Sequence, residues 1–246
     1  MFRYQILIEY LGTSFVGWQL QKKGNSVQKV IQLTLKKLLK EKVIIYGAGR
    51  TDAGVHAKEQ SAHFDIKNKI DNIEKFIKSC NFFLNPKNIS IINIKKKRSN
   101  FHARFSAKKR SYIYLIQNRF SPSIINNSKE WHIRKKLDID LIKKGSNQLI
   151  GTHDFSTFRS SNCNANSPIR TLNKIIITKS NTQIKLNFKS RSFLKNQVRS
   201  MVGCLKMVGE KKWSLKKFEK VIKSKNRKNC ATPAPAHGLY LEKVTY

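Results

Sequence analysis

The chain has 246 residues, of which 39% are hydrophobic, and it carries 50 Lys and Arg against 14 Asp and Glu, for a formal net charge of +36. This length and hydrophobic content support a sizeable folded core and exclude a disordered tail. The charge predicts a polyanionic partner, with nucleic acid the leading candidate. An AT-rich genome, which favours Lys, Ile and Asn throughout, would explain part of that charge without any partner.

The first hundred residues predict strands and helices in a defined order. Side chains alternate at strand period from Phe2 to Tyr10, and Ser26 is expected to cap a helix with apolar positions at helical spacing. Asp71 and Glu74 resemble a capping box for a second helix. The remaining expected elements are strands at 43–46, 61–66 and 89–94. The order β-α-β-β-α-β is typical of a ferredoxin-like unit.

The second half repeats this pattern less regularly. The expected elements are a strand at 112–116, a helix at 138–150, a hairpin formed by 173–178 and 183–188, helices at 198–205 and 213–222, and a strand at 238–244. The Ser- and Asn-rich stretch 155–168 is expected to be a surface loop. We therefore expect an α+β fold of two tandem ferredoxin-like (RRM-like) units with mainly antiparallel sheets.

The expected division lies between an N-terminal unit, 1–105, and a C-terminal unit, 106–246. Two basic runs, Lys95 to Arg98 and Lys108 to Arg110, flank this junction. A basic run is usually a solvated surface, but two of them at one junction would border a cleft. The active site is expected in that cleft between the units.

The four cysteines, Cys80, Cys163, Cys204 and Cys230, are widely separated, and none belongs to a Cys-x-x-Cys pair. The sequence therefore predicts no metal site and no disulfide framework, and it favours a reducing compartment. The N-terminus lacks the apolar core of a signal peptide, and no apolar run has the length needed to span a bilayer. We expect a soluble, cytoplasmic protein without membrane contact.

The run from Gly49 to Ala57 is the most informative stretch. It places Asp52 near Arg50 and His56 in a loop flanked by glycines, within a protein that has few acidic residues. Asp and Gly are common in turns for local steric reasons, so Asp52 could simply close a turn. A carboxylate beside a cation in so basic a protein is equally a candidate for chemistry.

Further blocks of the sequence accompany this run in a fixed order. They are Tyr10-Leu11-Gly12-Thr13, Gly17-Trp18-Gln19, Phe101 to Ala107, Arg110-x-Tyr112-x-Tyr114, His153-Asp154-Phe155, Phe193-Leu194 with Val198-Arg199, and Ala234-Pro235-Ala236-x-Gly238-Leu239-Tyr240-Leu241. Together with Gly49–Ala57 they resemble the tRNA pseudouridine synthases of the TruA type over nearly the whole chain. One block alone would be weak, but the ordered set is specific.

The resemblance implies an isomerase that converts uridine to pseudouridine in the anticodon stem–loop of tRNAs, at positions 38 to 40, and that acts as a homodimer. The reaction oxidises nothing and transfers no group to another molecule, so no cofactor is expected. By resemblance, Asp52 is the essential carboxylate. Arg50 and Arg199 would favour its ionised form, since a nearby cation lowers the pKa of a carboxyl.

The resemblance also assigns residues around the target base. Tyr112 would stack on a flipped uracil, and Leu239 would line the other side of the pocket. Each of these side chains also has an ordinary interpretation: Arg50 as turn support or a phosphate contact, Arg199 as a surface arginine, Tyr112 as a core tyrosine and Leu239 as a strand leucine. His56 and His102 could contact RNA or serve as hydrogen-bonded structural histidines.

The sequence departs from the family pattern at Leu11, where an Asp is usual, and at Lys195 to Gln197, which lacks an expected His or Met. Neither departure touches Asp52, Tyr112 or Arg199, so the two bear on local RNA contacts and not on the activity. Two alternatives stay open: a non-catalytic basic RNA-binding protein or chaperone, and a pseudouridine synthase for another structured RNA. An acid in a basic RNA-binding surface argues against the first, because it would repel phosphate.

Overall fold

The computed structural model describes all residues from 1 to 246 and confirms an α+β protein with mainly antiparallel strand pairing. The chain forms two compact units: residues 1–108 together with 240–246, and residues 109–239. This division differs from the one expected at residue 105 because the C-terminal segment belongs to the first unit. There the hydroxyl of Tyr246 donates a hydrogen bond to the carbonyl of Ala103 at 2.8 Å and lies 2.7 Å from the hydroxyl of Ser61.

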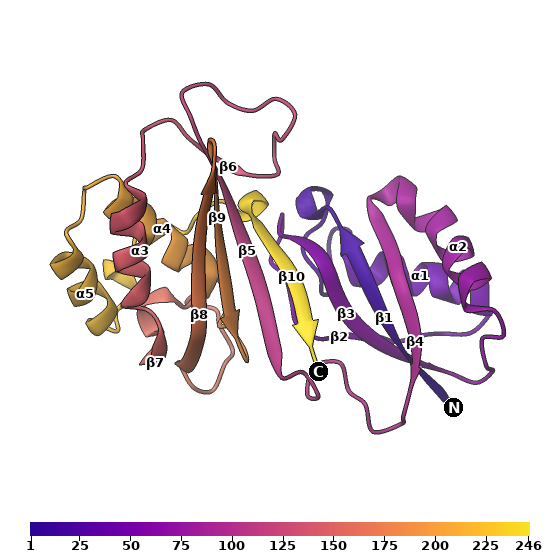
Figure 1. Cartoon of the computed structure of the whole chain (residues 1–246). Coiled ribbons are helices and arrows are strands. Elements are labelled where there is room, and N and C mark those ends of the chain that lie inside the picture. Colours follow the sequence, from indigo (N-terminus) through magenta and orange to yellow (C-terminus); the bar gives the residue numbers. More distant parts are fainter. The chain divides into compact units, whose positions relative to one another are not determined.

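The first unit follows the predicted order of elements. They are β1 (Phe2–Tyr10), the 3-10 turn η1 (Gly12–Ser14), α1 (Val27–Leu39), β2 (Ile45–Gly47), β3 (His56–Ile66), α2 (Ile73–Leu84), η2 (Asn85–Lys87), β4 (Ile89–Lys97) and β10 (Leu239–Thr245). Strand β1 pairs antiparallel with β3 on one edge and with β4 on the other. Figure 1 shows α1 and α2 together on one side of these strands.

Two short strands share the outer edge of β3. Strand β2 pairs antiparallel with residues 62–64, and β10 pairs in parallel through Tyr240 with His56 and Leu241 with Ala57. The segment between β2 and the start of β3 is the Gly49–Ala57 run. The loop that carries Asp52 is therefore anchored at both ends by paired strands.

The side chains of the first unit form the core that the periodicity predicts. Tyr4, Ile6, Ile8 and Tyr10 of β1 are buried. Ser26 caps α1, as predicted, with its side chain accepting a hydrogen bond from the amide of Lys29.

The predicted cap of the second helix was wrong. The N-cap of α2 is Asn72, whose Oδ1 accepts from the amide of Lys75 at 2.8 Å, and Asp71 is exposed one residue earlier. An N-cap side chain must stand directly before the first helical residue to reach the amide three positions on, and Asn72 holds that place.

The second unit contains β5 (Lys109–Asn118), β6 (Trp131–Ile133), α3 (Ile139–Asn147), β7 (Gly151–Asp154), η3 (Ser156–Phe158), β8 (Ile169–Ser180), β9 (Gln183–Ser190), α4 (Gln197–Gly209), α5 (Leu215–Lys223), η4 (Arg227–Asn229) and η5 (Ala236–Gly238). Its sheet has the antiparallel order β5-β9-β8-β7, and β6 pairs in parallel with β5. The predicted hairpin is confirmed as β8 and β9, with Asn181 at φ 50° in its turn. Helices α3, α4 and α5 pack on one another.

The structure differs from the prediction in part of the Ser- and Asn-rich stretch. Phe155 and Phe158 are fully buried and pack with ring centroids 6.0 Å apart, and the hydroxyl of Thr157 donates to the carbonyl of Val221. The composition predicted an exposed loop, but two aromatic rings here contribute to the core. No helix combines the length and the apolar character needed to cross a membrane.

Candidate active site

Asp52 lies half-buried in the loop between β2 and β3. The residue before it, Thr51, is held twice: its carbonyl accepts from the amide of Trp18 at 3.1 Å, and its hydroxyl lies 2.8 Å from that of Tyr10. The carbonyl of Asp52 itself accepts from the amide of Val55, also at 3.1 Å. These bonds fix the backbone on both sides of the carboxylate.

Two glycines from the beginning of the chain pack against this loop. A Cβ on Gly12 would lie 2.0 Å from the carbonyl oxygen of Val55, and a Cβ on Gly17 would lie 2.7 Å from that of Thr51. Gly17 also adopts φ 112°, which side-chain-bearing residues rarely adopt. The segment 12–18 therefore presses its backbone against the Asp52 loop, and only glycine leaves room for that contact.

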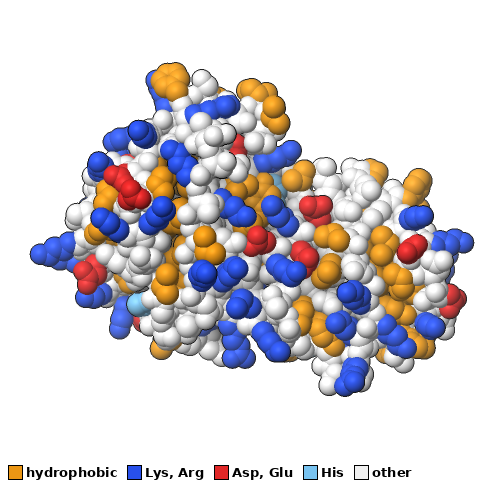
Figure 2. Space-filling view, in the orientation of Figure 1, with side chains coloured by type: hydrophobic (Ala, Val, Ile, Leu, Met, Phe, Trp, Pro, Cys, Tyr) orange, Lys and Arg blue, Asp and Glu red, His pale blue; other side chains and the backbone are white.

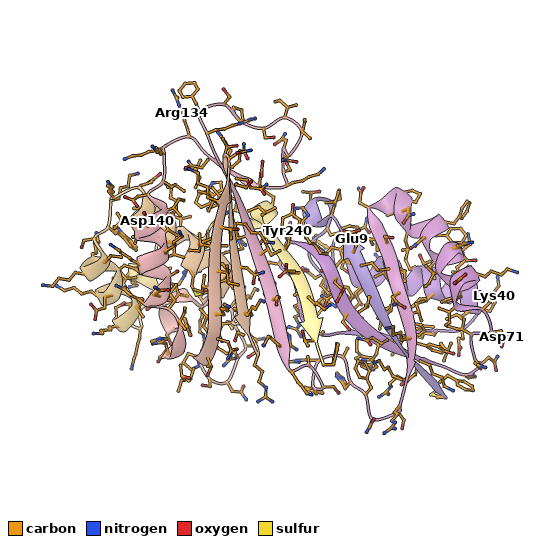
Figure 3. All side chains as sticks on the ribbon, in the orientation of Figure 1. Glu9, Lys40, Asp71, Arg134, Asp140 and Tyr240 are labelled. Atoms are coloured by element: carbon orange, nitrogen blue, oxygen red, sulfur yellow. The ribbon has the colours of Figure 1, made fainter.

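His56, at the end of the loop, packs and forms a hydrogen bond inside the first unit. It is fully buried, its Nδ1 accepts from the amide of Gly12 at 2.9 Å, and its ring packs 4.6 Å from that of Tyr240 on β10. This supports the structural interpretation of His56. A pocket of about 450 Å³ borders the end of the loop and is lined among others by Glu9 and Tyr240, both labelled in Figure 3.

Arg50 is exposed, two residues before Asp52 in the chain. His102 is half-buried, with its Nδ1 accepting from the amide of Arg104 at 3.1 Å. Burial lowers the pKa of His102, and the nearby Arg3 and Arg104 lower it further. His102 is therefore held as a neutral ring by its own surroundings.

The other predicted site residues lie in the second unit. Tyr112 is buried on β5, with its ring at 5.2 Å and edge-on to that of Phe193. Leu239 is buried where β10 begins. Tyr114 packs in the core, donates its hydroxyl to the carbonyl of Pro235 at 2.8 Å, and has a pKa raised by burial.

Arg199 is half-buried on α4 and is bonded to the segment that precedes β10. Its Nε donates to the carbonyl of Ala234 at 2.7 Å, its Nη1 donates to Asn196 Oδ1 at 3.3 Å, and its own carbonyl accepts from the amide of Ala234. Arg199 is thus a positioned side chain, not a freely solvated one. Burial lowers the pKa of His237 in the same segment, and the charge of Arg199 lowers it further, while a hydrogen bond with the backbone of Glu130 opposes both effects.

Sequence reasoning missed several of these contacts. The pairing of Tyr10 with Thr51 and the packing of Gly12 on Val55 join residues about 40 positions apart, and their only signal was the Tyr10–Gly12 block of the family resemblance. The cysteine spacing did not predict that Cys204 and Cys230 lie with their sulfurs 3.4 Å apart.

On the visible face of the protein, Lys and Arg side chains are spread over the whole surface and clearly outnumber the acidic ones (Figure 2). No group of three or more His, Cys, Asp or Glu side chains is placed to hold a metal ion. A braced, half-buried carboxylate on a strongly basic α+β protein fits an enzyme that acts on RNA.

Comparison with known proteins agrees with this class. The sequence model of a family described as tRNA pseudouridine synthase matches residues 6–106 and 146–246, one match in each half of the chain. A protein of Pelagibacter ubique (strain HTCC1062) named tRNA pseudouridine synthase A is 61% identical over 246 residues, covering all of both chains. A protein of the same name from Parvibaculum lavamentivorans (strain DS-1) is 42% identical over 246 residues, covering 99% of each.

The chain belongs to the tRNA pseudouridine synthase family. It is therefore an isomerase of tRNA, and the resemblance seen in the sequence is confirmed. The two matched segments also agree with two tandem units.

Proposed function

We propose that this protein isomerises uridine to pseudouridine at positions 38 to 40 of the anticodon stem–loop of tRNAs, with Asp52 as the essential carboxylate. The observation that carries the proposal is the Asp52 loop. Bonds from Trp18 and Tyr10 brace its backbone, and the packing of Gly12 constrains it further. Such bracing is what a reacting group needs to be held in place.

The reaction breaks the bond between N1 and C1′ of the target nucleotide and forms a bond between C5 and C1′. The proton on C5 is released, and N1 takes up a proton in its place. An ionised carboxylate can start this sequence as a nucleophile or as a base. Asp52 supplies that group, and the exposed Arg50 beside it adds positive potential to the loop.

The residues of the second unit have proposed roles in binding the target nucleotide. Tyr112 provides a ring face for the flipped uracil, Leu239 provides an apolar contact, and Arg199 supports the ionised Asp52. The bonds of Arg199 to Ala234 and Asn196 support a positioned cation, and the edge-on packing of Tyr112 on Phe193 supports a fixed ring. Aromatic–base stacking is worth roughly 1–3 kcal/mol, which offsets part of the cost of flipping.

We also propose that the protein acts in the cytoplasm as a homodimer in which one tRNA contacts both subunits. Sedimentation equilibrium should give twice the chain mass of 28.5 kDa, and a monomer under assay conditions would contradict the dimer.

The position of modification is tested with tRNA transcripts that keep a single uridine among positions 38, 39 and 40. Pseudouridine should form at each retained uridine and should be lost when all three are replaced by cytidine. Modification that persists in the triple replacement, or that occurs only in another structured RNA, would contradict the proposed target. The variant Tyr112→Ala should lower kcat/KM strongly, whereas Tyr112→Phe keeps the stacking ring and should lower kcat/KM much less.

A further inference from the structure

Four aromatic or imidazole rings of the first unit, Tyr46, His63, His102 and Phe105, contact one another in turn and form a ring series; the first pair is stacked, the second edge-on and the third tilted. Tyr46 lies 5.1 Å from His63, His63 lies 4.6 Å from His102, and His102 lies 4.3 Å from Phe105, all measured between ring centroids. Phe105 is the last ring of the series, and 72% of its surface is exposed. The guanidinium of the exposed Arg104 lies over this ring, 5.5 Å from its centroid. An exposed Phe ring together with an Arg suits a ligand with a flat face, since both groups stack on bases.

A cationic pocket adjoins Phe105 at the exposed end of this ring series. It encloses about 420 Å³ and is lined by Lys96, Lys97, Arg98, Asn100, Phe101 and Ser106. Ser106 directly follows Phe105 in the chain and is fixed in place, because its Oγ accepts from the amide of His102 at 3.0 Å. The pocket and the exposed ring are therefore parts of one surface.

The three cations of this pocket have no acidic partner. Neither Lys96, Lys97 nor Arg98 forms a salt bridge, and the nearby Asp65 is already paired with Arg3 at 2.7 Å. The ammonium of Lys97 instead lies 5.2 Å from the ring of Phe101. Unpaired cations beside aromatic rings match a phosphate followed by a base.

We propose that this surface, defined as Phe105 with the pocket of Lys96, Lys97, Arg98, Asn100, Phe101 and Ser106, binds a single-stranded nucleotide of the RNA substrate, outside the Asp52 loop. An unpaired base stacks on the exposed ring of Phe105 beside Arg104, and its backbone phosphate enters the cationic pocket. The Nδ1 atoms of His63 and His102 accept hydrogen bonds from backbone amides, and these rings support Phe105 without the strong hydration of a charged ring. The proposal rests on the proposed function for the identity of the RNA.

The test measures binding of a tRNA transcript and of a single-stranded RNA oligonucleotide by fluorescence anisotropy. Phe105→Ala should weaken binding of both by roughly 5- to 140-fold, and Phe105→Tyr, which keeps the ring, should bind nearly as well as wild type. Lys97→Ala should weaken binding and reduce the slope of log affinity against log salt by about 1. The matched controls are Phe82→Ala on α2, where the ring is 75% exposed, and Lys216→Ala on α5.

Equal effects of Phe105→Ala and Phe82→Ala would overturn the proposal. So would an equal loss of binding to poly-glutamate, because an acidic peptide offers no base to stack. Activity separates this inference from the proposed function. Phe105→Ala should raise KM for tRNA with little change in kcat, whereas an error in the proposed target would appear as wild-type protein that binds RNA but leaves positions 38 to 40 unmodified.

Discussion

Replacing Gly12 by Ala tests whether packing from η1 sets the geometry of the Asp52 loop. The added Cβ would lie 2.0 Å from the carbonyl oxygen of Val55, and ordinary contact begins near 3.4 Å, so the loop must retreat by about 1.4 Å. Overpacking of this kind costs about 1–3 kcal/mol. A displacement near 1 Å at a reacting group lowers the rate on the order of 100-fold. We therefore expect kcat to fall by about that factor and Tm to fall by several degrees.

The assay compares kcat for pseudouridine formation and thermal unfolding for wild type, Gly12→Ala and the control Gly145→Ala. Gly145 is helical, and its added Cβ would meet the movable end of Leu205 at 3.3 Å and the ring of Phe218 at an ordinary contact distance of 3.5 Å, so this control should keep its activity. Alanine leaves the hydrogen bond from residue 12 to His56 available, so the variant isolates the steric effect. A Gly12→Ala protein with kcat within twofold of wild type would refute the reasoning.

Three further predictions concern stability and binding. Burial, followed by the neighbouring His102, lowers the pKa of His63 from 6.5 to about 4. As the pH falls from 6.5 to 4, His63 is therefore protonated in the unfolded chain before it is protonated in the folded protein, and stability should be lost. Tm measured across that range should fall less steeply in His63→Gln than in wild type. Ser26→Ala removes the cap of α1 and should cost about 1 kcal/mol in denaturant unfolding, and an unchanged midpoint would show that the cap is dispensable. Affinity for tRNA should fall steeply between low and physiological salt, and binding insensitive to salt would contradict an electrostatic interface.

Local patterns were sufficient to predict the elements of the first unit. Strand β1 and the Ser26 cap of α1 follow from residues within a few positions of one another, and both are confirmed. The place of β10 could not be predicted, because its pairing with His56 and Ala57 joins residues more than 180 positions apart. Nor could composition show that Phe155 and Phe158 are buried within a polar stretch.

For the candidate site, too, the sequence predicted one part and the structure was needed for the rest. The motif pointed to Asp52, and the structure adds what holds it: the hydroxyl of Tyr10, the amide of Trp18 and the close approach of Gly12. The exposed ring of Phe105 belongs to a block that the sequence marked only by resemblance. Its proposed role in binding RNA depends on the ring series and on the unpaired cations beside it, which only the folded structure brings together.

The most direct test of the central claim is tritium release from tRNA labelled at C5 of uridine, measured with wild type and with Asp52→Asn. Asparagine has the size of the carboxylate but cannot act as a nucleophile or base of the same kind. Wild type should release tritium, while Asp52→Asn should bind tRNA with similar affinity and release none. Release by Asp52→Asn at a rate near that of wild type would contradict the role of Asp52 as the essential carboxylate.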